Sequence, residues 1–510
     1  MFPLNSAECT YAVHFMNMSS LSSGDREFFT ALDRVVYGNP FSERREKLIQ
    51  RLAPASKGTL DADRDTLARL VEPRLRPYLD LDDLQRLAAN DRRLVQSGFL
   101  YVCYHRHVAS IDKLIDQQPD HETAVHRIAQ SVTSDLVGRG IEEPLASRYF
   151  ALFFQLRRAF HFIVRSLTGN SESMRGLRRA LWDNVFTHDM RAFETGLWKR
   201  MEDFSTLILG ETGTGKGAAA AAIGRSAFIP YSFNERRFAA SYADSFIAIN
   251  LSQFAESLIE SELFGHRKGA FTGAIDHHQG VFERCNAHGA LFLDEIGEAS
   301  IPIQIKLLQV LQERTFTPLG SRDRKRFAGR VIAATNRTLA DLRGERRFRD
   351  DFFYRLCSDV IAVPTLRQRI EESPRELEEL VRLLVERTGG EENPDRAAFV
   401  MEALERDLPR GYPWPGNVRE LEQAVRRILL TGRYTGDVAD VSSSEEDRFA
   451  ESVRTGRLSA QELLGRYCVM LYRRFGTYAE VAERTGLDRR TARKYAVDYG
   501  PVADGEKVES

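Results

Sequence analysis

The sequence predicts a multidomain protein, with a mainly helical N-terminal region, an α/β core on a parallel sheet and a small all-α unit at the C-terminal end. Three observations lead to this fold class. The chain has 510 residues, too many for a single core. From about residue 167, strand-like runs alternate with helical segments, which indicates a parallel sheet covered by helices on both faces. A helix, turn and helix pattern lies near the end of the chain.

The N-terminal region contains helical patterns broken by polar residues. Its clearest pattern has apolar residues at alternating steps of four and three, which predicts one apolar helix face in a core or interface; a cofactor pocket is the alternative. These residues are Tyr149, Phe153, Leu156, Phe160, Ile163 and Leu167. In CYHRH, Cys103, His105 and His107 would share one side if the segment were a strand. No second ligand cluster is evident, so a metal site is not favoured.

The bulk composition is that of an ordinary globular protein and indicates no partner. Lys plus Arg (72) nearly equals Asp plus Glu (73). The five cysteines are scattered without a CxxC pair, which is typical of a reducing compartment, and no signal peptide is evident. The most apolar stretch, residues 148–167, carries four arginines, each unfavourable in a bilayer. We therefore expect a cytoplasmic protein without a membrane partner.

The stretch GETGTGK follows the apolar run TLIL and precedes a helical run of alanines, the context that a phosphate-binding loop requires. Glycines allow backbone N–H groups to turn toward phosphate oxygens, and the helix start adds partial positive charge. A chance glycine-rich turn is the alternative. The predicted ATP-contacting residues of this stretch are Gly210, Glu211, Thr212, Gly213, Thr214, Gly215, Lys216 and the following Gly217.

A second apolar run, ALFLDE, ends in Asp294 and Glu295. Strand ends of a parallel sheet meet the phosphate loop, so both carboxylates are expected beside it. Asp294 would hold Mg²⁺, directly or through water, and Glu295 would polarise the water that attacks the terminal phosphorus of ATP.

From about Leu167 to Leu430 the chain resembles the AAA+ domain of bacterial enhancer-binding proteins, which activate sigma-54 RNA polymerase. The motifs that carry the resemblance occur in the family's order: LTGNSESM, the phosphate loop, FIAIN, ESELFGHRKGAFTGA, GALFLDEI, IKLLQVLQE, RVIAATNR, FRDDFFYRL and YPWPGNVREL. The resemblance implies an AAA+ P-loop NTPase core with an α-helical lid, and ATP and Mg²⁺ as cofactors.

The resemblance also implies the roles of particular residues. Asn250 would sense nucleotide by contacting the catalytic Glu295. Arg349 and Arg355 would act as arginine fingers on the ATP of a neighbouring subunit, which implies a ring; a surface ion pair is the alternative role for either arginine. Further ATP contacts implied are Gly169, Asp294, Asn336 and Arg419. The implied sigma-54 contacts are Gly269, Ala270, Phe271, Thr272, Gly273 and Ala274, a tip whose glycines allow sharp turns.

Two features depart from the family pattern. Gly217 stands where a Ser or Thr hydroxyl would normally bind Mg²⁺ in phosphate-loop proteins, and where this family often has an acidic residue. The segment SAFIPYSFNERRFAASYADS before Asn250 is long for the family. We expect unusual ATP affinity or turnover from the first departure, and the second has no explanation at this level.

The C-terminal stretch TYAEVAERTGLDRRTARKYAVDYG predicts two helices joined at Gly486, with Ala482 where they cross and Leu487 packed beneath. The second helix is basic and suits a DNA major groove. The segment resembles the Fis-like helix-turn-helix of many enhancer-binding proteins; a solvated basic hairpin is the alternative. The predicted DNA-contacting residues are Arg489, Arg490, Thr491, Arg493 and Lys494.

The expected domains are a regulatory region over 1–165, an ATPase subdomain over 166–370, a helical lid over 371–435, a linker over 436–455 and a DNA-binding unit over 456–510. The expected function is ATP-driven activation of sigma-54 RNA polymerase from an upstream double-stranded DNA site. The protein would self-associate, from a dimer to a hexameric ring. The alternatives are an AAA+ regulator acting without sigma-54 and a DNA-binding repressor with a degenerate nucleotide site.

Overall fold

The computed structural model describes residues 20–54, 60–117, 122–344, 348–434 and 458–499, with isolated residues 436, 449, 452, 453 and 456. The described chain forms two compact units. The first contains the described residues up to Ala398 together with Tyr412–Arg426, and the second contains Phe399–Gly411 and the described residues from Arg427 onward. Most of the linker predicted over 436–455 lies outside the described residues.

The N-terminal region is helical, as predicted. Its helices are α1 (Ser23–Val36), α2 (Glu43–Leu52), α3 (Leu60–Leu75), α4 (Leu81–Arg86), α5 (Ala89–Gln117), α6 (Glu122–Val137) and α7 (Glu143–Ser166). A first core lies among α1, α3 and α5, where Phe29, Leu32, Val71 and Val95 are buried. At its edge, buried Asp91 accepts hydrogen bonds from Arg26 and from the backbone N–H of Leu21.

The CYHRH motif is helical, not extended. It lies inside α5, whose apolar residues Leu100, Ile111 and Leu114 join the core of α6 and α7. The helical period places Cys103 and His107 on one face and turns His105 away from it. In the part of the chain that the structure describes, no cluster of three or more His, Cys, Asp or Glu side chains is arranged to hold a metal ion.

The predicted parallel sheet is present in the order β4 (Phe246–Asn250), β5 (Ala290–Asp294), β8 (Arg330–Thr335), β1 (Thr206–Leu209) and β9 (Asp359–Ala362). Side chains alternate between its faces. Ile208, Phe292 and Ile332 face one core, shared with α7, α8 (Glu172–Phe186) and α10 (Lys216–Gly224). Leu207, Leu291 and Val331 face a second core.

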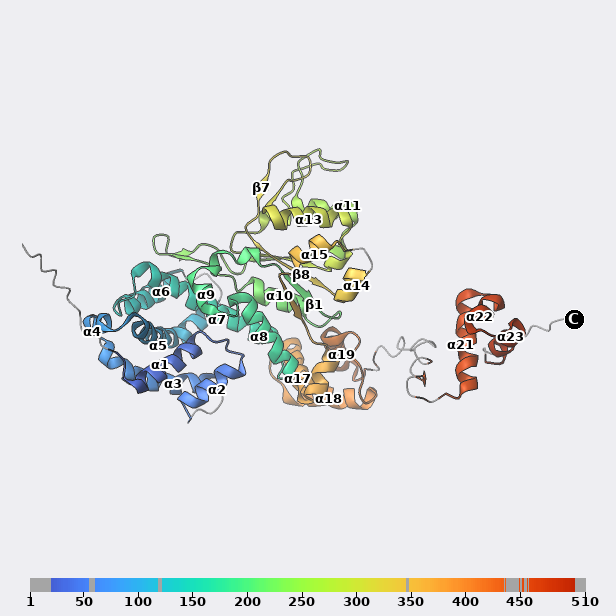
Figure 1. Ribbon diagram of the computed structural model, residues 1–510, viewed down its shortest axis with the longest axis horizontal. Coiled ribbons are helices and arrows are strands. Elements are labelled where there is room, and N and C mark those ends of the chain that lie inside the picture. The colour runs from blue at the N-terminus through green and yellow to red at the C-terminus, as the bar shows by residue number, and fades with distance from the viewer. Residues whose placement is uncertain are drawn as a thin grey trace, which may run out of the picture. The chain divides into compact units, whose positions relative to one another are not determined.

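The second core is covered by the helices on the other face of the sheet, where α13 and α15 lie (Figure 1). These helices are α11 (Glu256–Phe264), α12 (Val281–Arg284), α13 (Ile301–Glu313), α14 (Leu339–Gly344) and α15 (Asp350–Leu356). Short hairpins pair β2 (Tyr231–Ser232) with β3 (Arg237–Phe238) and β6 (Thr315–Phe316) with β7 (Lys325–Arg326). The short helix α9 (Met190–Thr195) follows α8.

Beyond β9 the regular elements of the described residues are all helices. The helices are α16 (Leu366–Glu372), α17 (Arg375–Gly389), α18 (Pro394–Asp407), α19 (Asn417–Thr431), α21 (Ala460–Phe475), α22 (Tyr478–Thr485) and α23 (Arg489–Asp498). None of the described helices has the length and apolarity needed to span a bilayer.

Candidate functional site

The phosphate-binding loop joins β1 to α10 with the geometry that its glycines predict. Gly213 and Gly215 have φ of +79° and +104°, values that favour glycine. A Cβ on Gly213 would lie 2.1 Å from the carbonyl oxygen of Gly416, so the loop closely approaches the turn before α19. Lys216 Nζ donates to the carbonyl oxygens of Gly210 and Glu211, at 2.9 and 3.2 Å. Its ammonium therefore lies inside the loop.

The strand ends bring the predicted acids to this loop. Asn250 and Asp294 are register partners at the ends of β4 and β5, and Glu295 follows with φ of +52°. Burial lowers the pKa of Lys216, while the nearby Glu295 and Asp294 carboxylates act in the opposite direction. An ammonium thus faces two carboxylates, an arrangement that can hold phosphate oxygens and a divalent cation together.

These groups line one pocket of about 340 Å³. The lining also has an apolar part, against which a flat ring could pack, formed by Leu167, Met174, Leu177, Leu380 and Leu384. The predicted residues that the structure brings together here are Thr212, Gly213, Thr214, Gly215, Lys216, Gly217, Asn250, Asp294, Glu295 and Arg419. Sequence reasoning missed other lining residues, including Arg387 and Glu422 of the lid helices.

The remaining predicted ATP residues lie around the pocket and do not line it. Asn336 Nδ2 is 3.4 Å from Thr212 Oγ1, and the Glu211 carboxylate accepts from Asn417 Nδ2 at 3.1 Å.

Asn250 uses its side-chain oxygen to accept from Ser252, and no hydrogen bond joins it to Glu295 among the described residues. In this structure Asn250 lies beside Glu295 in the pocket without contacting it through a hydrogen bond.

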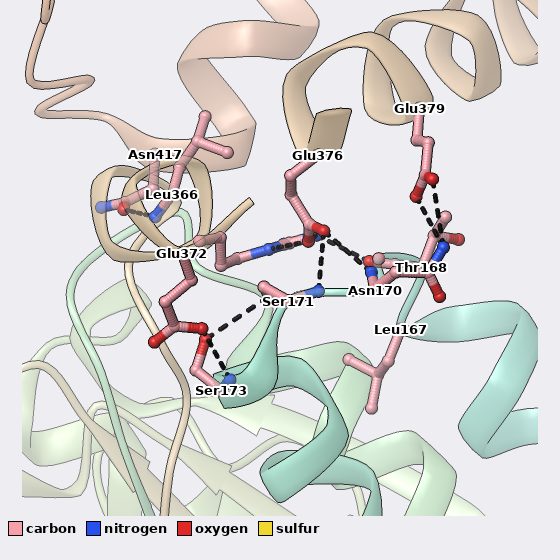
Figure 2. Close-up of polar contacts among 12 residues, drawn as sticks. Leu167, Thr168, Asn170, Ser171, Ser173, Leu366, Glu372, Glu376, Glu379 and Asn417 are labelled. Carbon is pink, nitrogen blue, oxygen red and sulfur yellow. Dashed lines mark hydrogen bonds and ion pairs between the residues drawn. The ribbon is translucent and has the colours of Figure 1, made fainter. Parts of the chain in front are cut away.

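Gly169 belongs to a segment that the lid helices bind (Figure 2). The buried Glu376 carboxylate accepts from the backbone N–H groups of Asn170 and Ser171, at 2.8 and 3.1 Å. Arg369 pairs with Glu376 at 2.6 Å and donates to the carbonyl oxygen of Thr168. Figure 2 also shows Glu372 accepting from the backbone N–H of Ser173. The segment that carries Gly169 is therefore held by α16 and α17.

Sequence reasoning missed the Arg369–Glu376 pair and Asn417. Asn417 donates to the carbonyl oxygen of Thr212 and accepts from the backbone N–H of Leu366, so it joins the phosphate loop to the lid. Its φ is +54°, and the PGN turn in which it lies is a signal that could have identified it. No sequence signal identified the ion pair, because Arg369 and Glu376 act by binding backbone groups that lie about 200 residues away in the sequence.

The two predicted arginine fingers lie outside this pocket. Arg349 forms a two-point ion pair with Asp351 at the start of α15, and Arg355 donates through Nε and Nη2 to the carbonyl oxygen of Leu311. Neither contributes to the lining around Lys216. The structure therefore does not bring them to the Lys216 pocket of their own chain.

The GAFTGA stretch lies in a loop between α11 and α12. Its base is paired: His266 exchanges backbone hydrogen bonds with His278, and Arg267 N–H donates to Leu319. Gly269 and Gly273 have φ of +80° and +102°. The Phe271 side chain is 37% exposed, with its ring 5.0 Å from that of His266, and Thr272 is exposed, whereas Ala274 is buried. The tip thus presents Phe271 and Thr272 to solvent on an ordered base.

The N-terminal region contacts the end of the phosphate-loop helix. Arg158 of α7 is buried and donates to the carbonyl oxygens of Arg225 and Ala227, at 3.1 and 2.7 Å. Gln155 donates to that of Ser226 at 2.9 Å. These carbonyls follow the last turn of α10, where a cation is favourable. Burial lowers the pKa of Arg158 to about 10, so its charge persists at neutral pH.

The long segment before Asn250 now has a structural role. It forms the β2–β3 hairpin, which packs on α6 and α7 through Tyr231 and Phe238 against Phe150, with ring centroids 5.1 and 5.8 Å apart. The Tyr231 hydroxyl lies 2.8 Å from His126 Nδ1. This segment is thus an arm that attaches the α/β core to the N-terminal helices.

The C-terminal helices carry the predicted DNA-binding residues. Cys468, Leu471, Val481, Ala492 and Ala496 form their small core. Gly486, with φ of +70°, ends α22, and the side chain of Asp488 caps α23. Arg489, Arg490, Arg493 and Lys494 are exposed along α23, and Thr491 is half-buried. The basic side chains are therefore free of the core and available to a ligand.

The family model described as "Sigma-54 interaction domain" matches residues 190–362. The transcriptional regulator NtrC of Rhizobium meliloti is 38% identical over 54% of this chain and 54% of its own length. The Sigma54-dependent transcriptional regulator SfnR of Pseudomonas fluorescens is 36% identical over 59% of this chain and 83% of its own. The regulator AlgB of Pseudomonas aeruginosa is 31% identical over 68% of this chain and 74% of its own length. The crystal structure of NtrX from Brucella abortus in complex with ATP aligns with 77% of this chain and 87% of its own, with 23% identity and a TM-score of 0.39.

The matched family model covers the α/β core. The chain spans about half the length of the NtrC relatives that it matches. It spans much more of SfnR and AlgB, at identities above 30%. The phosphate loop, the paired acids and the exposed Phe271 tip all lie in the region of the matched domain. The chain belongs to the family of sigma-54-dependent transcriptional regulators.

Proposed function

We propose that this protein hydrolyses ATP to activate sigma-54 RNA polymerase from an upstream double-stranded DNA site. The observation that carries the proposal is the single pocket in which Lys216, Asp294, Glu295 and Arg419 converge. The connection that carries the exposed Phe271 tip leaves the pocket edge at Asn250, the end of β4, and returns to the sheet at Ala290, the start of β5. A change at the end of β4 would be transmitted to the tip through this connection.

The pocket residues suit a bound Mg²⁺–ATP. Lys216 and the loop N–H groups would bind phosphate oxygens, and the Asp294 carboxylate would supply the oxygen ligand that Mg²⁺ prefers. Bound Mg²⁺ would neutralise charge between the phosphates. Glu295 would orient and deprotonate the attacking water, and Arg419 from the lid would reach the phosphate end. Gly217 offers no hydroxyl, so water or other oxygens would complete the metal's coordination.

Arg349 and Arg355 support assembly into a ring. Because they do not line the pocket of their own chain, their proposed action is on the ATP of a neighbouring copy. Mixing Lys216→Ala chains with Arg355→Ala chains tests this role. Each variant alone is expected to be inactive, and the mixture is expected to recover part of the ATP turnover. Absence of recovery, with ring formation shown by light scattering, would exclude action between subunits.

The proposal divides the chain into a regulatory region (1–165), an ATPase core with its lid (166–370 and 371–435), a linker (436–455) and a DNA-binding unit (456–510). The basic face of α23 would contact DNA, and the tip of the GAFTGA stretch would contact sigma-54. Since sigma-54 RNA polymerase acts in the bacterial cytoplasm, the proposal places the protein there.

The decisive experiment compares Glu295→Gln, Thr272→Ala and Arg322→Ala in the full chain, measuring ATP turnover and promoter opening separately. Glu295→Gln is expected to lower turnover by about 10²-fold or more. Thr272→Ala is expected to keep turnover and lose opening. Arg322→Ala, an exposed change on the neighbouring loop, is the control for both. Opening by Thr272→Ala at the unmodified rate would contradict coupling through this tip. No turnover by the unmodified chain would favour the repressor alternative.

A further inference from the structure

A second cavity, of about 330 Å³, lies where the N-terminal helices meet the start of the ATPase core. Its lining comes from α1, α2 and the connection between them, and from α5, α7, α8 and α9, all in the first compact unit. Its volume is in the range of sites for small organic ligands. It is separate from the nucleotide pocket, with which it shares no lining residue.

The walls of this cavity are mainly aromatic. Tyr101, Tyr104, Phe153, Phe160 and Trp182 all contribute to it. Tyr104 and Phe153 meet edge to face, with centroids 5.1 Å apart, so their rings are fixed in orientation. Aromatic faces attract both flat rings and cations. The shape and surface therefore favour a ligand with one or two rings.

One wall carries the Glu194 carboxylate of α9. Its oxygen accepts a hydrogen bond from the Tyr149 hydroxyl, and Tyr37 also interacts with it. Burial and the adjacent Glu194 raise the pKa of Tyr37, which keeps that hydroxyl a donor. Within the described ranges, no lysine, arginine or histidine lies at ion-pair distance from Glu194. The carboxylate thus has neutral donors but no counterion.

The cations around the cavity already have acceptors. Arg157 forms a two-point pair with Asp112, at 2.6 and 2.7 Å. Arg45 donates to the carbonyl oxygen of Val35, and Arg191 pairs with Asp33. Arg157 and Arg191 are thus each matched by an aspartate, whereas Arg45 donates to a neutral carbonyl, and Glu194 is the acidic residue of the lining. An ammonium on the ligand would form an ion pair with the Glu194 carboxylate, and the surrounding aromatic rings would stabilise the same positive charge.

We propose that this cavity binds a small aryl amine, with its rings between the aromatic walls and its ammonium on Glu194. The ligand would contact α7, α8 and α9 at once. Phe153, Leu156 and Phe160 of α7 face the cavity, and Gln155 and Arg158 of the same helix bind the end of α10. Occupancy would thereby fix the position of α7 relative to the phosphate-loop helix. This effect on ATP turnover rests on the proposed function, whereas binding does not.

Calorimetry on the full chain tests the site with 2-phenylethylamine, tyramine and tryptamine as probes. The matched neutral and acidic probes are 4-ethylphenol and 3-(4-hydroxyphenyl)propionate. We expect at least one amine to bind, and to bind at least tenfold more tightly than its neutral or acidic counterpart. No binding by any of the three amines at millimolar concentration overturns the proposal, as does tighter binding of the acid.

Three variants locate the site. Glu194→Gln keeps an acceptor for Tyr149 and is expected to weaken the amines at least tenfold while sparing 4-ethylphenol. Leu156→Trp fills the cavity and is expected to abolish binding of all probes, with circular dichroism confirming the fold. Glu143→Gln, an exposed change at the start of the same helix, is the charge-matched control. Equal amine affinity in Glu194→Gln and Glu143→Gln overturns the assignment.

The two proposals fail in different ways. If amines bind and Glu194→Gln prevents it, the cavity is established even when the protein shows no ATP turnover. If turnover is present but no amine binds, the ATPase proposal stands and the ligand site falls. If amines bind and turnover is unchanged by saturation, the site stands and its coupling through α7 is contradicted.

Discussion

Replacing Gly169 with alanine is predicted to release the segment 167–173 from the lid helices. A Cβ at this position would lie 1.9 Å from Glu376 Oε1 and 2.7 Å from Arg369 Nη2. The φ of Gly169 is +132°, a conformation that L residues rarely adopt. Neither acceptor nor donor can move aside freely, because the side chains of Arg369 and Glu376 are only 4% and 0% exposed. The added methyl must break the buried pair or move the segment away.

The magnitude follows from these two effects. Breaking a buried ion pair costs about 3–5 kcal/mol, and an unfavourable φ adds about 1–3 kcal/mol. Alanine recovers about 0.4–1 kcal/mol by restricting the unfolded chain. The net destabilisation of the docked segment is therefore about 5 kcal/mol, or several thousandfold in the equilibrium between docked and released states. This is comparable with the stability of a whole domain, so the segment should open locally.

Hydrogen–deuterium exchange resolves this local opening. The amides of Asn170 and Ser171, which donate to Glu376, are expected to lose most of their protection in Gly169→Ala. Nucleotide binding should weaken as well, because Leu167 and Thr168 line the pocket. Gly176→Ala is the matched control: it lies inside α8 with nothing within 4 Å of its Cβ, and should stabilise the helix by up to about 1 kcal/mol. Unchanged protection in Gly169→Ala would refute the close contact.

Three further changes have defined outcomes. Arg158→Met removes two charge-assisted hydrogen bonds but also the cost of burying a charge, so we expect the free energy of unfolding to fall by about 2 kcal/mol and amide exchange at the end of α10 to become faster. Exposed Arg165→Met is the control, and equal exchange in both variants would contradict the contact. Gly217→Ser has room, since the nearest atom to its Cβ is 3.9 Å away in Phe292; we expect a lower Mg²⁺ requirement for ATP binding in titrations, and no change would show that the position does not face the metal. Arg490→Ala should reduce the salt dependence of DNA binding by about one unit of slope, measured by anisotropy, whereas Arg466→Ala on α21 should leave it unchanged.

The sequence predicted those parts of the protein that short segments determine. The strands, the phosphate loop and the Asp294–Glu295 pair were identifiable because each lies in a continuous motif, and the parallel sheet then brings their ends together. The contacts of Arg158 and of the β2–β3 hairpin were not predictable, because they join residues about 70 to 80 positions apart without a local pattern. The condition under which CYHRH would place its three ligand-type side chains on one side, a strand, is not met, because the motif lies inside the long helix α5.

The attachment of α7 determines how the proposed regulatory role of the N-terminal helices can be studied. Its Arg158 and Gln155 satisfy the carbonyls that end α10, and its Phe150 covers Tyr231 and Phe238 of the hairpin. Deleting the N-terminal helices would expose this apolar surface and leave those carbonyls without donors, which costs free energy in proportion to the buried area removed. A deletion that lowered ATP turnover would therefore report a damaged core rather than the loss of an activating signal. Whether the N-terminal helices raise or lower ATP turnover must be measured with changes that keep α7 in place, such as ligand occupancy or Leu156→Trp in the full chain. These changes alter the cavity while the end of the phosphate-loop helix stays capped.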